Sequence, residues 1–241
     1  MKLLLLGGTS EARALAKRLH PDVELISSLA GRVPDPALPV GPVRIGGFGG
    51  VDGLRTYLQD NEITAVVDAT HPFAANITAN AAQACAGLRL PHLVLARPAW
   101  PHGDAIVVAD DRQAAQTVED HGYQRVFLTT GRSGTPAFRA SDAWFLIRAV
   151  TPPEADTLPP HHHILLSRGP YDYDNELTLL RDHRIDALVT KNSGGGMTRA
   201  KLDAAAALKI PVIMVDRPAL PGAVVTAATV DDAEAWVRAR R

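Results

Sequence analysis

Two glycines near the start of the chain stand where a phosphate could bind. Residues 3–6 form a fully apolar run, which suits a buried parallel strand, and Gly7 and Gly8 follow it directly. Thr9 or Ser10 can then cap a helix whose apolar residues recur at helical spacing. Such a turn directs backbone N–H groups and the positive end of the helix dipole at one point, which stabilises a phosphate. The full fingerprint G-x-G-x-x-G is absent, so an ordinary first strand–helix turn of an α/β domain fits this segment as well.

The end of the second expected strand favours NADP over NAD. This strand covers residues 23–28, and Arg32 follows Ser28 by four positions. In a dinucleotide-binding fold this strand ends beside the adenosine ribose, where an NAD enzyme usually has an acidic residue. A hydroxyl and a guanidinium are instead donors that suit a 2′-phosphate. A solvated loop arginine is the alternative interpretation of Arg32.

Basic and polar residues follow many of the expected strands, and acidic residues are fewer there. In open parallel sheets, ligands bind beyond the carboxyl ends of the strands. The residues at these ends are Thr9, Ser28, Arg32, His71, Arg97, Thr130, Arg132, Ser133, Ser167, Arg168, Lys191, Asn192, Ser193 and Arg217. A nearly neutral chain that concentrates cations at these positions is expected to bind anions. A dinucleotide's phosphates would use some of the cations, and the remainder indicate a substrate with several carboxylates.

The histidines differ in what they could do. His71 follows a buried strand and precedes Pro72, which holds it out of the next helix, so it is either catalytic or a capping and packing residue. Residues 161–163 are three consecutive histidines in a loop after two prolines. Adjacent side chains of an extended segment point in opposite directions, so no metal site is expected there.

Several other chemistries lack their motifs. The sequence has no G-x-x-x-x-G-K-[ST] phosphate loop, no H-E-x-x-H metal motif and no G-x-S-x-G nucleophile turn. No tyrosine stands four residues before a lysine, so the acid of short-chain dehydrogenases is missing.

The elements that must position these residues alternate along the chain as apolar strands and amphipathic helices. This pattern predicts an α/β fold with two doubly wound Rossmann-like parallel-sheet domains and a cleft between them. Pro98 and Pro101 flank a turn-rich connection. We therefore expect an N-terminal dinucleotide-binding domain over residues 1–98 and a C-terminal, substrate-contacting α/β domain over residues 99–241.

Composition limits the possible partners and compartments. The net charge of −1 in 241 residues provides no basic field for nucleic acid. No apolar run approaches the roughly 20 residues of a membrane span, and no signal peptide is expected before the first strand. The single cysteine, Cys85, cannot form an internal disulfide, which indicates the cytoplasm.

Six segments together resemble the NADPH-dependent precorrin-6A reductases of cobalamin biosynthesis, and the resemblance runs along essentially the whole chain. These segments are Leu-Leu-Gly7-Gly8-Thr9-Ser10-Glu11, Ser28-Leu-Ala-Gly-Arg32, Asp68-Ala-Thr-His-Pro-Phe73, Thr130-Gly-Arg-Ser-Gly134, Ser167-Arg-Gly-Pro-Tyr171 and Thr190-Lys-Asn-Ser-Gly-Gly195. The resemblance implies hydride transfer from NADPH to a double bond of the precorrin macrocycle, which gives precorrin-6B. This tetrapyrrole is rimmed with acetate and propionate groups. Gly196 extends the last segment to a third glycine, where the family's usual residue is not assumed.

The resemblance also implies roles for individual residues. NADP is expected at Gly7, Gly8, Thr9, Ser10, Glu11, Ser28, Arg32 and Thr70. The substrate is expected at Arg132, Ser133, Arg168, Lys191, Asn192 and Ser193. The proton-donor candidates are His71, Tyr171 and Asp68, in that order, with bound water as an alternative. Two other functions remain open: a non-catalytic two-domain module that binds an anionic metabolite, and a phosphoryl- or glycosyl-handling enzyme.

Overall fold

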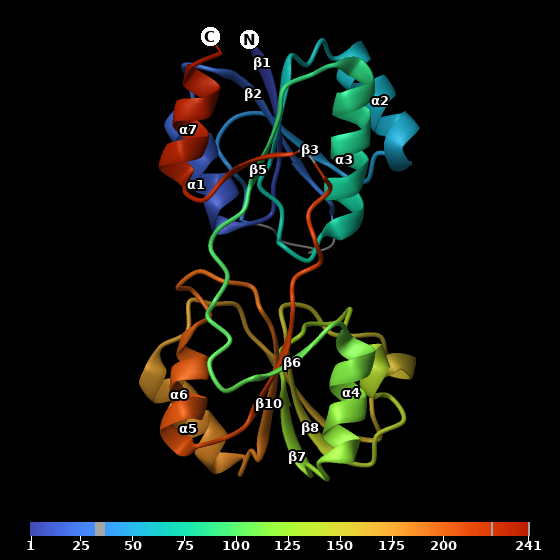
Figure 1. Ribbon diagram of the computed structural model, residues 1–241, viewed down its shortest axis with the longest axis vertical. Coiled ribbons are helices and arrows are strands. Elements are labelled where there is room, and N and C mark those ends of the chain that lie inside the picture. Colours follow the sequence, from blue (N-terminus) through green and yellow to red (C-terminus); the bar gives the residue numbers. More distant parts are fainter. Residues whose placement is uncertain (32–36, 223, 241) are drawn as a thin grey trace. The chain divides into compact units, whose positions relative to one another are not determined.

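The chain folds into two compact units, each built around a six-stranded parallel sheet (Figure 1). The computed structural model describes residues 1–31, 37–222 and 224–240. Unit 1 contains Met1–Pro98 together with Pro218–Arg241, and unit 2 contains Ala99–Arg217. The predicted α/β fold with two doubly wound sheets is confirmed. No helix in the described ranges is long and apolar enough to cross a membrane.

Unit 1 has the strand order β12-β5-β4-β1-β2-β3. Its strands are β1 (Lys2–Leu6), β2 (Glu24–Leu29), β3 (Val43–Ile45), β4 (Ala65–Asp68), β5 (His92–Leu95) and β12 (Val225–Ala227). Its helices are α1 (Ser10–Leu19), α2 (Gly50–Asp60), α3 (Ala75–Leu88) and α7 (Val230–Arg238).

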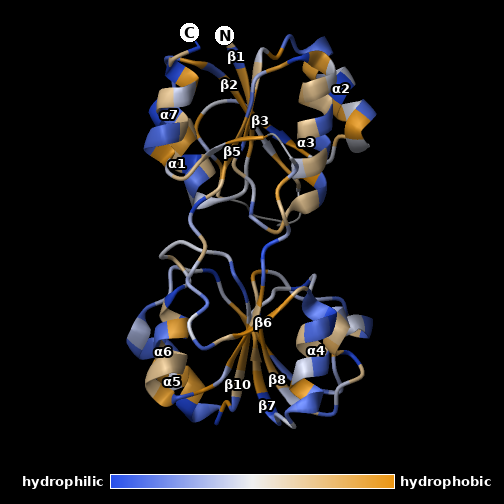
Figure 2. Cartoon of the chain, in the orientation of Figure 1, coloured by the Kyte–Doolittle hydropathy of each residue, from blue (hydrophilic) through white to orange (hydrophobic). Residues whose placement is uncertain are grey.

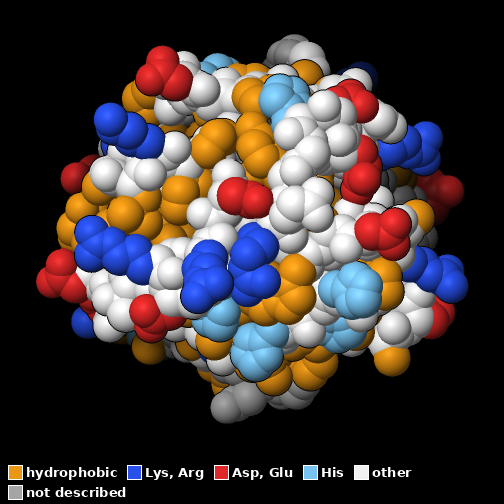
Figure 3. Space-filling view, turned by 90° about the horizontal axis from the view of Figure 1, so that it is seen from below, with side chains coloured by type: hydrophobic (Ala, Val, Ile, Leu, Met, Phe, Trp, Pro, Cys, Tyr) orange, Lys and Arg blue, Asp and Glu red, His pale blue; other side chains and the backbone are white. Residues whose placement is uncertain are grey.

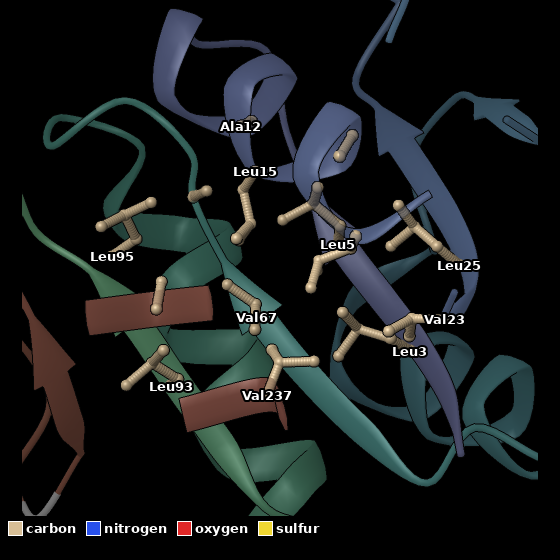
Figure 4. Close-up of a cluster of buried hydrophobic side chains, with 14 of the residues drawn as sticks. Leu3, Leu5, Ala12, Leu15, Val23, Leu25, Val67, Leu93, Leu95 and Val237 are labelled. Carbon is tan, nitrogen blue, oxygen red and sulfur yellow. The ribbon is translucent and has the colours of Figure 1, made fainter. Parts of the chain in front are cut away.

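The leucines of β1 form the centre of unit 1 because they are buried on both faces of the sheet. Leu3 and Leu5 point into a cluster that α1 and α7 cover, whereas Leu4 and Leu6 point into a second cluster against α2 and α3. Figure 4 shows the first cluster, where Leu15 and Val237 meet the strand side chains. In Figure 2 the strands are mostly orange, whereas the helices carry hydrophobic and hydrophilic residues together. The apolar run of β1 therefore reflects burial from both sides.

Unit 2 has the strand order β6-β11-β10-β7-β8-β9. Its strands are β6 (Ile106–Val108), β7 (Arg125–Leu128), β8 (Trp144–Ala149), β9 (His161–Leu166), β10 (Ala187–Lys191) and β11 (Val212–Val215). Its α-helices are α4 (Asp111–Asp120), α5 (Tyr173–Asp182) and α6 (Ala200–Leu208), and short 3₁₀ helices cover Thr135–Phe138 and Ala155–Thr157.

The two sheets differ in which part of the chain supplies one edge strand, because this strand is the first of unit 2 and the last of unit 1. Strand β6 joins unit 2 directly after the chain leaves unit 1, and β12 joins unit 1 after the chain leaves unit 2. The prediction that one domain extends over residues 99–241 is therefore wrong at its C-terminal end. Residues 218–241 belong to unit 1, because β12 pairs with β5 and α7 packs Ala233 and Val237 into the core of that unit.

Helix α5 begins at Tyr173 and is capped by the side chain of Asp172, which accepts from the backbone N–H of Asn175. One local assignment differs from the sequence-based expectation. The three histidines at 161–163 belong to strand β9 and not to a loop. Among the described residues, no group of three or more His, Cys, Asp or Glu side chains could hold a metal ion.

The returning helix α7 should contribute measurably to the stability of unit 1. Val237 is fully buried, so Val237→Ala removes two methyl groups from the core, and we expect a loss of about 2 kcal/mol in the free energy of unfolding of unit 1. The same change at the exposed Val225 of β12 serves as the control and should cost under about 0.5 kcal/mol. Urea denaturation measures both, and equal effects of the two changes would contradict the packing of α7 described above.

Candidate functional site

Each sheet has one point where the chain reverses its direction of winding. In unit 1 this point lies between β1 and β4, and in unit 2 it lies between β7 and β10. The loops after these strands diverge there, and ligands of open α/β sheets bind in the resulting crevice. The described residues among those predicted for the cofactor lie at the carboxyl ends of strands in unit 1, and those predicted for the substrate lie at the carboxyl ends of strands in unit 2.

The glycine turn after β1 has the conformation that a phosphate site requires. Gly8 has φ +115°, which other residues rarely adopt, and a Cβ atom there would meet nothing within 4 Å. The Thr9 hydroxyl accepts from Ala12 N at 3.1 Å and donates to Ala69 O at 2.7 Å, so it is committed to capping α1 and fixing the turn. Among the described residues, the N–H groups of Gly8 and Ser10 have no hydrogen-bond partner. The backbone is therefore the part of this turn that can bind an anion.

A pocket lies beside this turn. Its lining residues include Gly7, Gly8, Arg13, Ser27, Leu29 and Pro39. Gly7 N donates to Ser28 O at 2.9 Å, which keeps the start of the turn in register with β2. The pocket thus adjoins both the Gly7–Gly8 turn and β2, the strand that the sequence analysis expects beside a ribose.

Glu11, predicted to contact the cofactor, already has partners within unit 1. Its carboxylate accepts from Ser10 Oγ and from Arg97 Nη1, both at 2.9 Å. Burial alone would raise the pKa of Glu11, but its own backbone N–H, Arg97 and Ser10 together hold that pKa below its ordinary value. The ionised carboxylate therefore ties the loop after β5 to the first turn of α1.

Two of the predicted proton donors lie at the carboxyl end of β4, Asp68 as its last residue and His71 in the loop that follows. Asp68 is 1% exposed, and its Oδ1 accepts from Thr70 N at 3.0 Å and from Thr70 Oγ1 at 2.7 Å. His71 is exposed, and its Nδ1 accepts from Phe73 N at 3.3 Å. Asp68 therefore shapes the turn, whereas His71 reaches the surface.

The ends of β2 and β3 carry an arginine that the sequence analysis did not single out. Ser28 is buried and pairs with Arg44 in the sheet, and Arg44 Nη1 lies 3.3 Å from Ser28 Oγ. Arg32, predicted to select NADP, lies outside the described residues. Arg44 could have been found only from the pairing of β3 with β2, because this pairing brings Arg44 next to Ser28, 16 positions earlier in the sequence.

In unit 2, Lys191 holds the loops of the switch point together. Its Nζ donates to Thr130 O at 2.9 Å and lies 3.4 Å from Asp111 Oδ2. Gly134 lies in the same loop and leaves no room for a side chain. A Cβ there would stand 2.3 Å from Thr130 Oγ1 and 2.6 Å from Asp111 Oδ1. Lys191 thus neutralises a carboxylate and fixes the loop after β7.

Asn192 is also structural, because its side chain is fully buried against the segment that enters unit 2. Its Oδ1 accepts from Trp100 N at 2.8 Å, and its Nδ2 donates to Trp100 O at 3.1 Å. Arg217, where the chain leaves unit 2, donates to Asn192 O at 2.8 Å and to Ser193 O at 3.0 Å. Both crossing segments are therefore attached to the loop after β10.

The other predicted substrate residues are more accessible. Arg132 and Ser133 are exposed in the loop after β7, and Arg168 is exposed in the loop after β9. Ser193 is half-buried beside Asn192. The geometry therefore separates the six predicted residues into exposed ligand candidates and residues that hold the loops.

A buried ion pair lies under Tyr171. Arg148 and Glu176 form two hydrogen bonds, of 2.9 and 2.7 Å, and both side chains are buried. The guanidinium carbon lies 4.0 Å from the centre of the Tyr171 ring, whose hydroxyl donates to Ser167 O at 3.1 Å. No motif indicated Arg148 or Glu176, because each lies inside a strand or helix and meets the other only in the folded chain.

Lys201 is a second buried cation near this pair. Its Nζ donates to Thr198 O at 2.8 Å and lies 4.9 Å from the Trp100 ring centre. Burial and then the neighbouring Arg148 lower the pKa of Lys201 to about 7, and Glu176 offsets part of this effect.

Two parallel α/β units, one with a glycine turn at its switch point and one with arginine-bearing loops, define a two-domain protein of the Rossmann-like class. The family model for precorrin-6x reductase CbiJ/CobK matches residues 2–238, and the chain belongs to this family. The family resemblance predicted from six sequence segments is confirmed.

Relatives and a solved structure match along almost their full lengths. Precorrin-6A reductase of Mycobacterium tuberculosis (strain ATCC 25618 / H37Rv) is 65% identical over 236 residues, which cover 98% of this chain and 97% of the relative. The enzyme of that name from Rhodococcus erythropolis is 55% identical over 246 residues, with coverage of 98% and 97%. The structure of CobK precorrin-6A reductase has a TM-score of 0.91 at 39% identity, covering 99% of this chain and 97% of that one. These comparisons do not support the alternative of a non-catalytic binding module.

The buried Lys201 should make the stability of unit 2 depend on pH above neutrality. Its folded pKa of about 7 lies below the value of roughly 10.4 in an unfolded chain. Between these values the unfolded chain binds a proton that the folded chain does not, so stability should rise as the pH increases from 7 towards 10.

The measurement is urea denaturation of the wild type and of Lys201→Met at several pH values from 7 to 10. The wild type should have the steeper rise, by at most about 1.4 kcal/mol per pH unit. Lys209→Met, which changes an exposed lysine at the end of the same helix, should keep the wild-type slope. If Lys201→Met also keeps the wild-type slope of stability against pH, Lys201 does not titrate between pH 7 and 10.

Proposed function

We propose that this protein is a precorrin-6A reductase of cobalamin biosynthesis, which reduces a double bond of the macrocycle with NADPH and yields precorrin-6B. The observation that carries this proposal is the 65% identity to a precorrin-6A reductase over nearly the whole of both chains. The reaction adds a hydride and a proton to the substrate. The protein must therefore orient two flat ring systems, exclude water and supply the proton.

Unit 1 is the proposed cofactor-binding unit. The open space at Gly8 and the available N–H groups of Gly8 and Ser10 fit a pyrophosphate that approaches the backbone closely. Ser28 would face the ribose, and Thr70 lies across the switch point. When bound there, NADPH supplies the hydride. The chain's own contribution is to hold the turn through Thr9 and the β4 loop through Asp68.

Unit 2 is the proposed substrate-binding unit. A tetrapyrrole with several carboxylates needs cations that remain accessible, and Arg132 and Arg168 are exposed at the carboxyl ends of β7 and β9. A guanidinium can bind a carboxylate through two parallel hydrogen bonds. Ser133 and Ser193 add hydroxyl donors, while Lys191 and Asn192 support the loops from beneath.

His71 is the proposed proton donor. An imidazole changes its charge near neutral pH, and His71 is exposed beside the switch point of unit 1. Tyr171 ranks second because its hydroxyl donates to Ser167 O, and Asp68 third because it is buried.

His71→Gln should lower kcat at least tenfold and leave the Kd for NADPH unchanged. An unchanged kcat would assign the proton to another group or to water.

A small-molecule partner and the cytoplasm complete the proposal. On the face seen in Figure 3, Lys and Arg side chains are interspersed with Asp, Glu, His and apolar residues. This distribution, with a net charge of −1, differs from the basic surface that nucleic acid requires. The single cysteine, Cys85, is buried and free, which suits a reducing compartment.

The activity is tested by incubating the protein with precorrin-6A and NADPH under anaerobic conditions. We expect NADPH oxidation and a product that is heavier by two hydrogens. A titration with NADPH alone separates binding from turnover. If the protein neither binds NADPH nor reduces the macrocycle, the proposal fails.

Steady-state kinetics test the division of labour between the units. Arg132→Ala and Arg168→Ala should each raise the KM for the tetrapyrrole roughly tenfold, since each removes a charged hydrogen-bonding group, and should leave the Kd for NADPH unchanged. Arg181→Ala removes an exposed arginine from the last turn of α5 and is the matched control. A loss of NADPH affinity with an unchanged KM would instead place the cofactor's phosphates on these loops.

A further inference from the structure

Arg44 lies where the ribose of a bound dinucleotide carries its distinguishing group. Ser28, near the end of β2, pairs with Arg44 of β3, and the Arg44 guanidinium lies 3.3 Å from Ser28 Oγ. In dinucleotide-binding folds the end of the second strand faces the 2′ position of the adenosine ribose. The end of β2 therefore has a hydroxyl from Ser28 and a guanidinium from Arg44, and neither of these groups depends on Arg32.

The Arg44 guanidinium is held in one orientation. Its Nη1 donates to Gly46 O at 2.5 Å and its Nη2 to Gly47 O at 2.6 Å, while its carbon lies 3.8 Å from the centre of the Phe48 ring. A Cβ atom at Gly46 or at Gly47 would meet nothing within 4 Å, so these two glycines are open on the side where a Cβ would stand. A planar donor that is already fixed loses little conformational entropy when it binds an anion.

The charge of Arg44 also lacks a counter-ion within the described ranges of the chain. Its hydrogen-bond partners there are the Ser28 hydroxyl and two backbone carbonyls, and its Nε–H has none. By contrast, Arg97 of the same unit pairs with Glu11 and Arg55 pairs with Asp52. A half-buried guanidinium that meets only neutral oxygens is suited to an added phosphate.

We propose that Arg44, together with Ser28, binds the 2′-phosphate of NADPH and so determines the preference for NADP over NAD. This inference rests on the proposed function, because it requires that unit 1 bind a dinucleotide. The Nε–H group and the second Nη2 hydrogen would face the phosphate, while the bonds to Gly46 and Gly47 keep the guanidinium in place.

The experiment is calorimetric titration of the full chain with 2′,5′-ADP and with 5′-AMP, which differ by the 2′-phosphate alone. The wild type should bind 2′,5′-ADP at least tenfold more tightly than 5′-AMP. Arg44→Ala should abolish most of this preference by weakening 2′,5′-ADP and leaving 5′-AMP unchanged, and Arg44→Lys should retain part of it. Arg55→Ala is the control in the neighbouring helix, and Arg32→Ala measures the contribution of the residue singled out from the sequence.

The outcomes separate this inference from the function on which it rests. Equal losses for both nucleotides in Arg44→Ala would show that Arg44 only holds the Gly46–Gly47 turn, and would overturn the inference. A wild-type preference that survives in Arg44→Ala would also overturn it and would leave Arg32 as the selector if Arg32→Ala removes the preference. If the wild type binds neither nucleotide nor NADPH, it is the proposed function that fails.

Discussion

Parallel strand pairing is the constraint on which the rest of this protein depends. Every registered strand pair in both sheets is parallel, so each strand needs a crossover, and the carboxyl ends of all strands meet at one edge of their sheet. Residues far apart in the sequence are thereby collected at one place, as Gly8 and the loop of Asp68 are in unit 1. The same constraint buries the central strands on both faces, which explains the uninterrupted leucines of β1.

The loops at these edges contain more charged and polar groups than ligand binding alone requires. Several of them stabilise the loops: Lys191 with Asp111, Asn192 with the Trp100 backbone, and Glu11 with Arg97. A buried polar group costs stability unless it is hydrogen-bonded, so these partners allow irregular backbone to be fixed near the core. In unit 2 the loop after β7, which carries the exposed Arg132, is thus held by Lys191 through Thr130 O.

The sequence predicted the fold class, the family and the Gly7–Gly8 turn because strong local patterns mark them. It did not predict that β12 belongs to unit 1, since a three-residue edge strand with two exposed positions has almost no apolar signal. The residue types of Lys191 and Asn192 suggested that both bind ligand. Their hydrogen bonds in the folded chain show that both side chains hold loops in place. Arg44, Arg148 and Lys201 depend on contacts between separate elements, which periodicity and motifs do not reveal. Whether the predicted site residues bind the cofactor and substrate stays a prediction.

The return of the chain to unit 1 after unit 2 sets the order in which the two units can be completed during synthesis. The N-terminal part of unit 1 leaves the ribosome before unit 2, yet its β12 and α7 follow unit 2 in the sequence. Unit 2 lies wholly within the intervening segment and has all six strands available earlier. Until β12 and α7 emerge, β5 presents an unpaired edge and the leucine cluster around Leu15 lacks the cover of α7. The first unit to be translated is therefore the last that can finish folding.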